Sequence, residues 1–474
     1  MTDTIDPEWM PAWQLRRMMA DRALSPVELM HTTLERTDRL GPILNPFLTV
    51  ARDRALLEAA EAEAAIRRGD ELGPLHGIPV SIKDVFWTRG LRTTYGSALF
   101  ADFVPSEDAT FVRRLREAGA IIFAKTNTSE FSQFRRTLNL VSNECVTPWD
   151  DGLERSSAGS SGGSAVAVAA GLGPVSIGSD GGGSIRIPSS VNGVFGFATS
   201  RGRVPVGPAT YHSPMTQLGP ITRDVLDAAD TLAVITAGAL DYRSTIDEGV
   251  RGLRIAWTPD LGYISPLEPD VLDVAHEAAM TFSELGAILD EPDLRLPNVY
   301  DPFERGRGLS ITRRGGTESE KLPGVPTYEE FISKISADPM KFAQLTAYVQ
   351  SLRTGLQQPS ILEYANSLSP AVRRRIPEDL DTVFEHFDLI ACPVAGFPAF
   401  TANDSRLNWT NYTSYTLLVN VAGFAGCSIP AGYVNGLPVG LQLFAPPERE
   451  PLLLRAARAL ERARPWSDVR PPVH

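Results

Sequence analysis

The pattern of apolar and polar positions changes about seventy residues into the chain. Before that point, apolar residues recur with the period of a helix. Ser25, followed by Pro26 and by Glu28 three positions after the serine, forms a capping box with proline at the first helical position. Residues 52–70 read as a second, long helix with a polar face. The pattern therefore predicts a helical N-terminal segment over residues 1–70.

From residue 73, short apolar runs alternate with amphipathic stretches. GIPVSIKDV (77–85) and AIIFAKTN (120–127) predict buried strands, and DATFVRRLREAG (108–119) predicts the helix between them, ending at Gly119. Further along, GLRIAWTP predicts a strand before a helix over 269–285, and DLDTVFEHF predicts a helix before the strand DLIACPV. This alternation predicts an α/β fold with a mixed sheet covered by helices.

The chain contains no Pro/Ser-rich linker, low-complexity tract or internal repeat that would divide it. We therefore predict one large domain over residues 1–474. Within it we distinguish a core with the chemical motifs over 73–295 and its C-terminal part over 376–474. A polar, arginine-rich helical insertion over 300–375 separates the two, and such insertions often form a wall of a pocket.

The composition of the chain argues against nucleic-acid-binding, membrane-bound and metal-dependent proteins. The chain is 43% apolar and 22% charged, as globular proteins are, and its net charge of −12 does not favour a nucleic-acid partner. We find no secretory leader and no apolar run of membrane-spanning length, so we expect a cytoplasmic protein that does not bind membranes. The three cysteines are too widely spaced for a zinc site, and we expect no metal or cofactor.

Lysine is rare, and that makes its positions informative. Only five of the 45 basic residues are lysines, so arginine normally supplies the positive surface charge. Lys83 nevertheless lies inside the apolar run GIPVSIKD. A buried lysine has a lowered pKa and can serve as a base, so this residue calls for a chemical explanation.

The segment over 154–190 is crowded with glycine and serine. It reads as a loop, a small-residue helix over 164–173, a short strand, a glycine loop and a further strand. Gly181, Gly182 and Gly183 free successive backbone N–H groups to point into one concavity, which suits an oxyanion. Ser184 follows them directly, as the nucleophile of an acyl transfer would. None of the six histidines stands in a motif that marks it as the base, which leaves Lys83 as the candidate.

These segments resemble the amidase signature family. The resemblance rests on G-I-P-V-x-I-K-D, A-K-T-N-x-x-E-F (124–131), G-S-S-G-G-S (159–164) and G-S-D-x-G-G-S-I-R-I-P (178–188), together with GLPVGLQLF (436–444). The blocks occur in the family's order and span most of the chain. The resemblance implies an α/β/α fold around a mixed, twisted sheet and a Ser-cisSer-Lys triad.

Transferred by motif, the resemblance assigns roles to individual residues. Ser184 would be the nucleophile, Ser160 the bridging serine at a cis peptide bond, and Lys83 the base. The oxyanion hole would comprise the N–H groups of Gly181, Gly182, Gly183 and Ser184, and the pair that braces this loop would be Asp180 and Arg186.

Three departures from the family's usual sequence affect substrate and loop rigidity more than the triad. Gly181 stands where threonine or isoleucine is common, which loosens the oxyanion loop. GFATSRGRV (196–204) lacks the family's lysine-proline corner, and GFAGCSIP (423–430) replaces another common phrase.

Several alternatives compete with these assignments. GSSGG also fits the G-x-S-x-G elbow with Ser161 as nucleophile, but the preceding DGLERSSA is polar and unlike the strand that an elbow needs. A nucleotide-binding loop would need a glycine-lysine pair, which the chain lacks. Cys427 is more simply a packed thiol, and His76 and His212 are more simply structural or pocket-lining residues. Asp180 and Arg186 could also form ordinary, separate ion pairs.

The function that the resemblance implies is hydrolysis of carbon–nitrogen acyl bonds. The aromatic stretch over 408–418 and the insertion suggest a roomy pocket for aryl or hydrophobic amides, and a carbamate presents the same carbonyl to the same triad. The alternative is a glutaminase-type subunit of a partner-dependent amidotransferase. Ile187, where that subunit usually has glutamine, and the 300–375 insertion favour a free-standing hydrolase, as a monomer or homodimer, whose partner is a small amide or carbamate.

Overall fold

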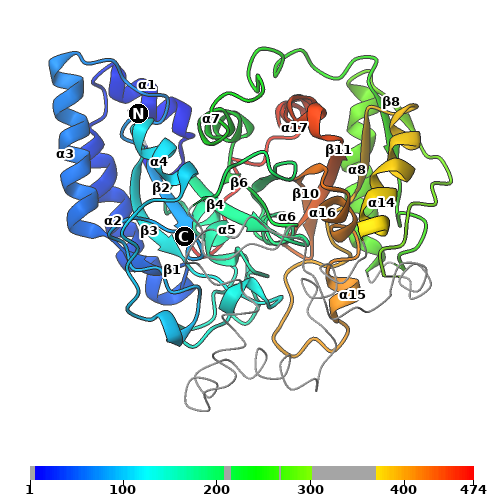
Figure 1. Ribbon diagram of the computed structural model, residues 1–474, viewed down its shortest axis with the longest axis horizontal. Coiled ribbons are helices and arrows are strands. Elements are labelled where there is room, and N and C mark those ends of the chain that lie inside the picture. The colour runs from blue at the N-terminus through cyan, green and yellow to red at the C-terminus, as the bar shows by residue number, and fades with distance from the viewer. Residues whose placement is uncertain (1–5, 208–214, 266–267, 301–369) are drawn as a thin grey trace.

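One mixed sheet runs through the part of the chain that the structure describes. The computed structural model describes residues 6–207, 215–265, 268–300 and 370–474 (Figure 1). In these residues the sheet has eleven strands in the order β1-β3-β2-β4-β6-β5-β10-β11-β9-β7-β8. The strands are β1 (Phe47–Val50), β2 (Pro79–Lys83), β3 (Ile121–Thr126), β4 (Val175–Asp180), β5 (Phe195–Ala198), β6 (Gln217–Thr222), β7 (Arg254–Trp257), β8 (Ile288–Asp290), β9 (Leu389–Pro393), β10 (Ala425–Val434) and β11 (Leu437–Ala445).

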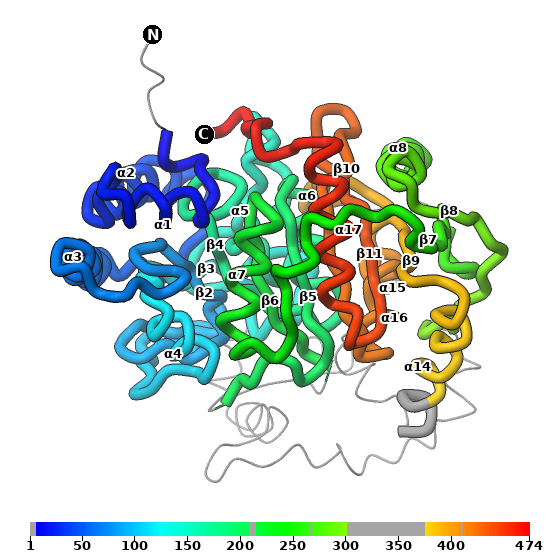
Figure 2. The backbone as a smooth tube through the Cα atoms, turned by 90° about the horizontal axis from the view of Figure 1, so that it is seen from above, coloured from blue at the N-terminus to red at the C-terminus, as the bar shows by residue number. Residues whose placement is uncertain are grey.

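Helices cover this sheet, so the predicted α/β fold class is confirmed. The described helices of more than one turn are α1 (Ala12–Ala20), α2 (Pro26–Leu44), α3 (Arg52–Arg68), α4 (Thr110–Glu117), α5 (Gly162–Ala169), α6 (Arg186–Val191), α7 (Val225–Ile235), α8 (Pro269–Glu284), α14 (Pro370–Phe384), α16 (Leu417–Ala422) and α17 (Glu450–Ala463). A single turn, α15 (Trp409–Tyr412), precedes α16. Figure 2 shows α7 and α17 lying along the middle of the sheet.

The N-terminal segment folds largely as its pattern predicts. The Ser25 hydroxyl accepts hydrogen bonds from the backbone of Val27 and Glu28, and the Glu28 carboxylate accepts one from Ser25, which confirms the capping box. The prediction of helix alone was wrong at β1, which pairs antiparallel with β3 at the edge of the sheet. A four-residue strand between two long helices carries too short a pattern to be recognised without its partner.

The two faces of the sheet are covered by different helices. Along β4, Val175 and Ile177 join the main core together with Leu232 of α7. Gly178 points to the other face, where a side chain would come 2.9 Å from Ile185, just before α6. Alternating side chains along a strand therefore separate a hydrophobic layer on one face from the motif segments on the other.

The chain forms the helix α6 over Arg186–Val191, so the prediction of a strand after the glycine loop was wrong. The apolar alternation Ile185, Ile187 imitates a strand. The Asp180 carboxylate, however, accepts hydrogen bonds from the backbone N–H groups of Gly183, Ile185 and Arg186, and this stabilises the first turn of α6. Pro188 lies within that first turn, where its missing N–H costs no helical hydrogen bond.

The prediction of a helical insertion over 300–375 falls almost entirely outside the described residues, and α14 begins at Pro370. The single-domain organisation stays a prediction. Among the described helices, none combines the length and the apolarity needed to cross a membrane.

Candidate active site

Two neighbouring parallel strands bring the predicted base and the glycine loop together. Strand β2 pairs in parallel with β4, with Ser81 opposite Ser176 and Ile82 opposite Ile177. Lys83 is the last residue of β2, and Asp180 is the last residue of β4. Functional groups of open α/β sheets gather at the carboxyl ends of such strands, which places both motifs at one edge.

Lys83 contacts two serine hydroxyls. Its Nζ lies 2.6 Å from the Oγ of Ser160 and 2.8 Å from the Oγ of Ser179. The lysine is fully buried, and Ser160 is 1% exposed. The Gly159–Ser160 peptide bond is cis. The structure thus joins two of the three predicted triad residues directly.

Burial changes the acid-base properties of Lys83. Removal of the ammonium group from water lowers the pKa of Lys83 well below its usual value of 10.5, and the negative charge of Asp180 opposes this only in part. The contact with Ser160 is compatible with a neutral amine that accepts a proton from the serine. Within the described residues, no group of three or more His, Cys, Asp and Glu side chains is arranged to hold a metal ion.

Ser184 is half-buried and lies beside these groups without a direct bond to them. Its carbonyl accepts a hydrogen bond of 3.2 Å from the backbone of Ser161, next to Ser160. Among the hydrogen bonds of the described residues, none joins the Oγ atoms of Ser184 and Ser160. The backbone contact between their loops nevertheless keeps the three predicted triad residues in one site.

The glycine loop before Ser184 is held from two sides. The Gly183 N–H donates to Asp180 Oδ1 at 2.6 Å, and Gly183 has a φ of 122°, a conformation that favours glycine. The Gly182 carbonyl accepts a hydrogen bond of 2.6 Å from the Thr416 hydroxyl. Because the Gly183 N–H already has an acceptor, the structure does not favour its predicted place in the oxyanion hole. Among the hydrogen bonds of the described residues, none engages the N–H groups of Gly181, Gly182 or Ser184.

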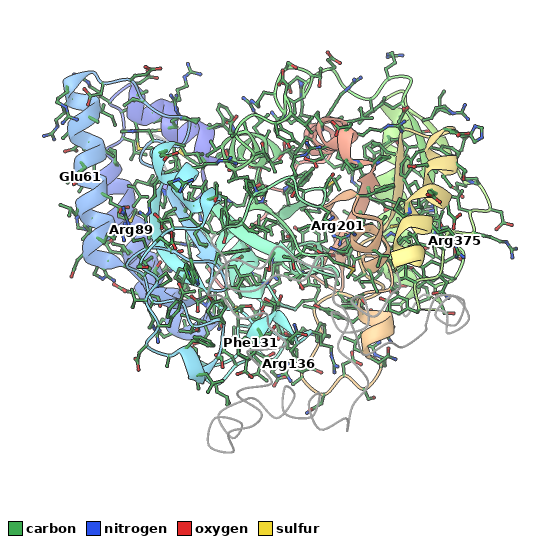
Figure 3. The ribbon with its side chains drawn as sticks, viewed as in Figure 1. Glu61, Arg89, Phe131, Arg136, Arg201 and Arg375 are labelled. Atoms are coloured by element: carbon green, nitrogen blue, oxygen red, sulfur yellow. The ribbon has the colours of Figure 1, made fainter. Side chains whose placement is uncertain are left out.

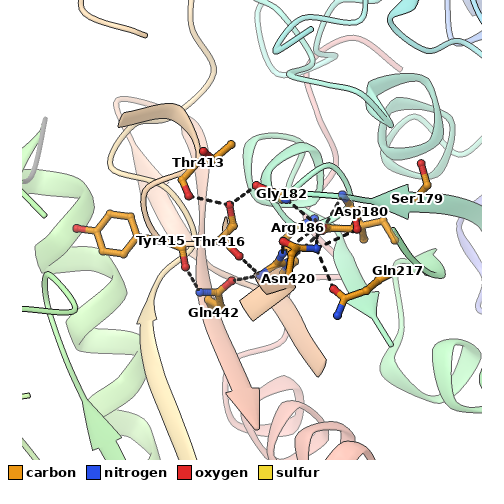
Figure 4. A network of polar contacts seen from close by, with 12 residues as sticks. Ser179, Asp180, Gly182, Arg186, Gln217, Thr413, Tyr415, Thr416, Asn420 and Gln442 are labelled. Carbon is orange, nitrogen blue, oxygen red and sulfur yellow. Dashed lines mark hydrogen bonds and ion pairs between the residues drawn. The ribbon is translucent and has the colours of Figure 1, made fainter. Parts of the chain in front are cut away.

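Asp180 and Arg186 form a buried ion pair beneath the loop, as the bracing assignment expects (Figure 4). Arg186 donates two hydrogen bonds to the carboxylate, at 3.0 and 2.9 Å, and both side chains are fully buried. Arg186 also donates to Asn420 and Gln442, and Asn420 in turn donates to Asp180. The network therefore ties β4 and α6 to α16 and β11.

The network keeps Asp180 ionised. Burial alone would raise the pKa of Asp180, but the Arg186 guanidinium and hydrogen bonds from Arg186 and Asn420 outweigh that effect and hold the pKa well below its usual value of 3.8. The site thus contains a fixed negative charge near a lysine that burial drives toward neutrality.

The A-K-T-N-x-x-E-F block lies next to the site and has a structural role in this chain. Lys125 is buried and donates to the Phe86 carbonyl at 2.6 Å, and its ion-pair partner is Asp84, which directly follows Lys83. The Ser97 hydroxyl donates to Glu130 at 2.6 Å. Phe131, the last residue of this block, and Arg136 belong to the segment after β3, and both are labelled at the lower edge of Figure 3. This block therefore supports the end of β2, where Lys83 lies.

Sequence reasoning missed the groups that hold the two serine loops. Ser179 stands inside a quoted motif, and its place next to Asp180 was the available signal. Tyr412 and Thr416 contact Gly159 and Gly182 across 253 and 234 positions of sequence, and nothing local in their segment indicates these partners. The aromatic stretch by itself predicts only a pocket wall, whereas Tyr412 and Tyr415 are 2% and 1% exposed.

The competing assignments have ordinary structural explanations. Ser161 is fully buried, its hydroxyl donates to the Ser179 carbonyl at 3.1 Å, and the described residues directly before it form no strand. His76 contacts the Ala62 carbonyl through Nε2. Cys427 is buried in β10, and burial raises the pKa of its thiol to about 12. His212 lies outside the described residues.

Several known proteins are similar to this chain in sequence and in fold. A family model described as Amidase matches residues 28–454. The chain is 35% identical, over 98% of its own length and 99% of the relative's, to a glutamyl-tRNA(Gln) amidotransferase subunit from Moorella thermoacetica. A bacterial aryl acylamidase has a structure with a TM-score of 0.81 at 27% identity over 97% of each chain. The structure of the corresponding amidotransferase subunit from Thermotoga maritima gives a TM-score of 0.72 at 28% identity, covering 98% of this chain and 96% of that one.

Proposed function

This chain belongs to the amidase signature family, and from that premise we propose that it hydrolyses carbon–nitrogen acyl bonds through an acyl-enzyme on Ser184. Lys83 is the base, and Ser160 carries protons between Lys83 and the reacting atoms. The observation that carries the proposal is the 2.6 Å contact between Lys83 Nζ and Ser160 Oγ in a fully buried setting.

Acylation begins with a proton relay. Neutral Lys83 takes the proton of Ser160, Ser160 takes the proton of Ser184, and the Ser184 oxygen forms a bond to the acyl carbon. The carbonyl oxygen gains the negative charge and is stabilised by the N–H groups of Gly181, Gly182 and Ser184. The charge on Asp180 favours the lysinium form that the relay creates.

Collapse of this intermediate breaks the carbon–nitrogen bond. An amine leaves poorly unless it is protonated, so Ser160 gives a proton to the departing nitrogen and regains one from Lys83. Water then attacks the acyl carbon and gives one proton through Ser160 to Lys83. The relay returns a proton to the Ser184 oxygen as its bond to the acyl carbon breaks, which releases the acid and restores Ser184. Atoms and protons balance without a further reactant.

We propose aryl or otherwise hydrophobic amides as substrates, with aryl carbamates as a second class. The high structural similarity to an aryl acylamidase supports the first class. A carbamate presents a carbonyl with a nitrogen leaving group, so the same relay serves it.

The second candidate is the glutaminase-type subunit of an amidotransferase, which works with protein partners. The identity of 35% to an amidotransferase subunit, over almost the whole of both chains, favours it. Because that match extends through the 300–375 segment, the presence of the segment does not exclude this candidate, contrary to our expectation from sequence. The higher TM-score for the aryl acylamidase supports the free-standing hydrolase.

A substrate panel tests the proposal. The purified chain alone is incubated with acyl 4-nitroanilides of increasing acyl size, an aryl carbamate and glutamine. We expect release of nitroaniline, fastest with aryl or long acyl groups, and no release by Ser184→Ala. Hydrolysis of glutamine alone, or activity that appears only with added amidotransferase partner subunits, would contradict the free-standing hydrolase and support the second candidate.

A further inference from the structure

We propose that Tyr412 is a positioning residue that holds Ser160 in place for proton delivery to the leaving group. Neither the aromatic stretch over 408–418, which contains Tyr412, nor the motifs that carry the family resemblance indicate this role. The inference rests on the proposed function, because it assumes that Ser160 carries the proton to the departing nitrogen.

The Tyr412 hydroxyl makes two hydrogen bonds to the residue that precedes Ser160. It accepts from the Gly159 N–H at 3.0 Å and donates to the Gly159 carbonyl at 2.9 Å. One hydroxyl thus satisfies both backbone groups of a buried glycine. The Gly159 carbonyl belongs to the peptide unit that leads into Ser160, so the contact acts one bond away from the bridging serine.

Packing fixes where this hydroxyl can be. Tyr412 is 2% exposed, and its ring stacks on Phe397 with centroids 5.6 Å apart and an interplanar angle of 20°. Phe400 meets the same ring edge-on at 6.1 Å. A ring held on two sides has little freedom, so the hydroxyl is a fixed point against which Gly159 is located.

The other side of the Gly159 backbone leaves it little room to move. A side chain at Gly159 would come 2.7 Å from the Phe134 carbonyl, so the loop after β3 packs closely against it. The Gly159 backbone is therefore enclosed between that loop and the Tyr412 hydroxyl. Removal of the hydroxyl opens one side only, and Ser160 would then shift relative to Lys83.

The same short segment holds the other serine loop separately. Thr416, four residues after Tyr412, donates to the Gly182 carbonyl before Ser184. The two contacts affect different groups of the reaction. Loss of the Tyr412 contact should impair proton transfer through Ser160, which an amide needs both to activate Ser184 and to protonate the leaving nitrogen, whereas loss of the Thr416 contact should disturb the oxyanion loop, on which amides and esters depend alike.

The ratio of the amide rate to the ester rate distinguishes a positioning role of Tyr412 from a general structural role, which would leave this ratio unchanged. Amides need a proton at the leaving nitrogen, whereas an ester with a nitrophenolate leaving group does not. A displaced Ser160 should therefore slow amide hydrolysis more than ester hydrolysis of the same acyl group. A merely less stable protein would lose both activities together.

Tyr415→Phe is a matched control. Tyr415 lies on the same segment, is 1% exposed, and donates a hydrogen bond of 2.8 Å to the Pro259 carbonyl. Its replacement removes a buried phenol hydroxyl of the same kind, away from both serine loops. Any effect of simply losing such a hydroxyl will appear in both variants.

The experiment measures kcat and KM for a matched 4-nitroanilide and 4-nitrophenyl ester in wild type, Tyr412→Phe, Tyr415→Phe and Thr416→Val. For Tyr412→Phe we expect an amide kcat about tenfold or more lower, a KM within about twofold, and a clearly smaller fall in the ester kcat, because the ester needs Ser160 to activate Ser184 and water but not to protonate the leaving group. Thr416→Val should lower both rates, and Tyr415→Phe should leave the amide-to-ester ratio unchanged.

Phe397→Leu provides a second route if Tyr412→Phe does not fold, because it loosens the ring and keeps the hydroxyl. We expect the same fall in the amide-to-ester ratio, smaller in size. An unchanged ratio in either folded variant, with active wild type, would overturn the role of Tyr412. A wild type that cleaves neither substrate would instead overturn the proposed function.

Discussion

At the scale of single residues, Lys83 combines properties that seldom occur together. It is a fully buried lysine whose hydrogen bonds to described residues include no carboxylate, and it contacts serine oxygens on two sides. Buried lysines are ordinarily paired, as Lys125 of the neighbouring strand β3 is with Asp84. The contrast explains why we assign chemistry to Lys83 and support to Lys125.

The pKa of Lys83 predicts how activity depends on pH. Because burial lowers this pKa, the neutral base is present well below pH 10.5. The value of kcat/KM should rise with pH as Lys83 loses its proton and then level off. Lys83→Ala should lower kcat by roughly 10²–10⁴. Initial rates between pH 5 and 10 measure both effects.

Lys83→Arg is the control for this profile, because arginine keeps its charge over the whole range and cannot act as the base. It should be inactive at every pH. A flat profile in the wild type, or a rise that survives in Lys83→Arg, would contradict the assignment of the base.

At the scale of elements, the sequence predicted those that carry a regular pattern. The strands β2, β3, β7 and β9 were recognised from their apolar runs, and the start of α2 from its capping box. The strand β1 and the helix α6 were not recognised. The strand depends on pairing with β3, which is distant in sequence, and the helix depends on a side-chain contact that leaves no periodic pattern. Helix α6 begins where Asp180 accepts its first N–H groups, a contact that no periodicity reveals.

The ion pair between Asp180 and Arg186 predicts a stability effect at this scale. Arg186→Met would leave a buried carboxylate without its cation, which typically costs about 3–5 kcal/mol. We expect the free energy of unfolding to fall by that amount in urea titrations. Adding Asp180→Asn should recover part of the loss, because no unpaired charge then remains. If the free energy of unfolding of Arg186→Met lay within about 1 kcal/mol of the wild-type value, that result would contradict the bracing role.

At the scale of the whole molecule, residues far apart in sequence meet at one edge of the sheet. The motif blocks supplied Lys83, Ser160 and Ser184, and the resemblance supplied their roles. The supports from the C-terminal third, such as Tyr412 with Gly159 and Thr416 with Gly182, are set by tertiary packing alone. Sequence could therefore indicate which groups meet at the site but, apart from Asp180 and Arg186, not what holds them in place.

The most direct test of the central claim is the site at which a serine-directed fluorophosphonate reacts. Peptide mass spectrometry of the labelled chain should find one adduct, on Ser184, which is absent in Ser184→Ala and strongly slowed in Lys83→Ala. An adduct on Ser161 or another residue, or undiminished labelling of folded Ser184→Ala, would show that Ser184 is not the nucleophile.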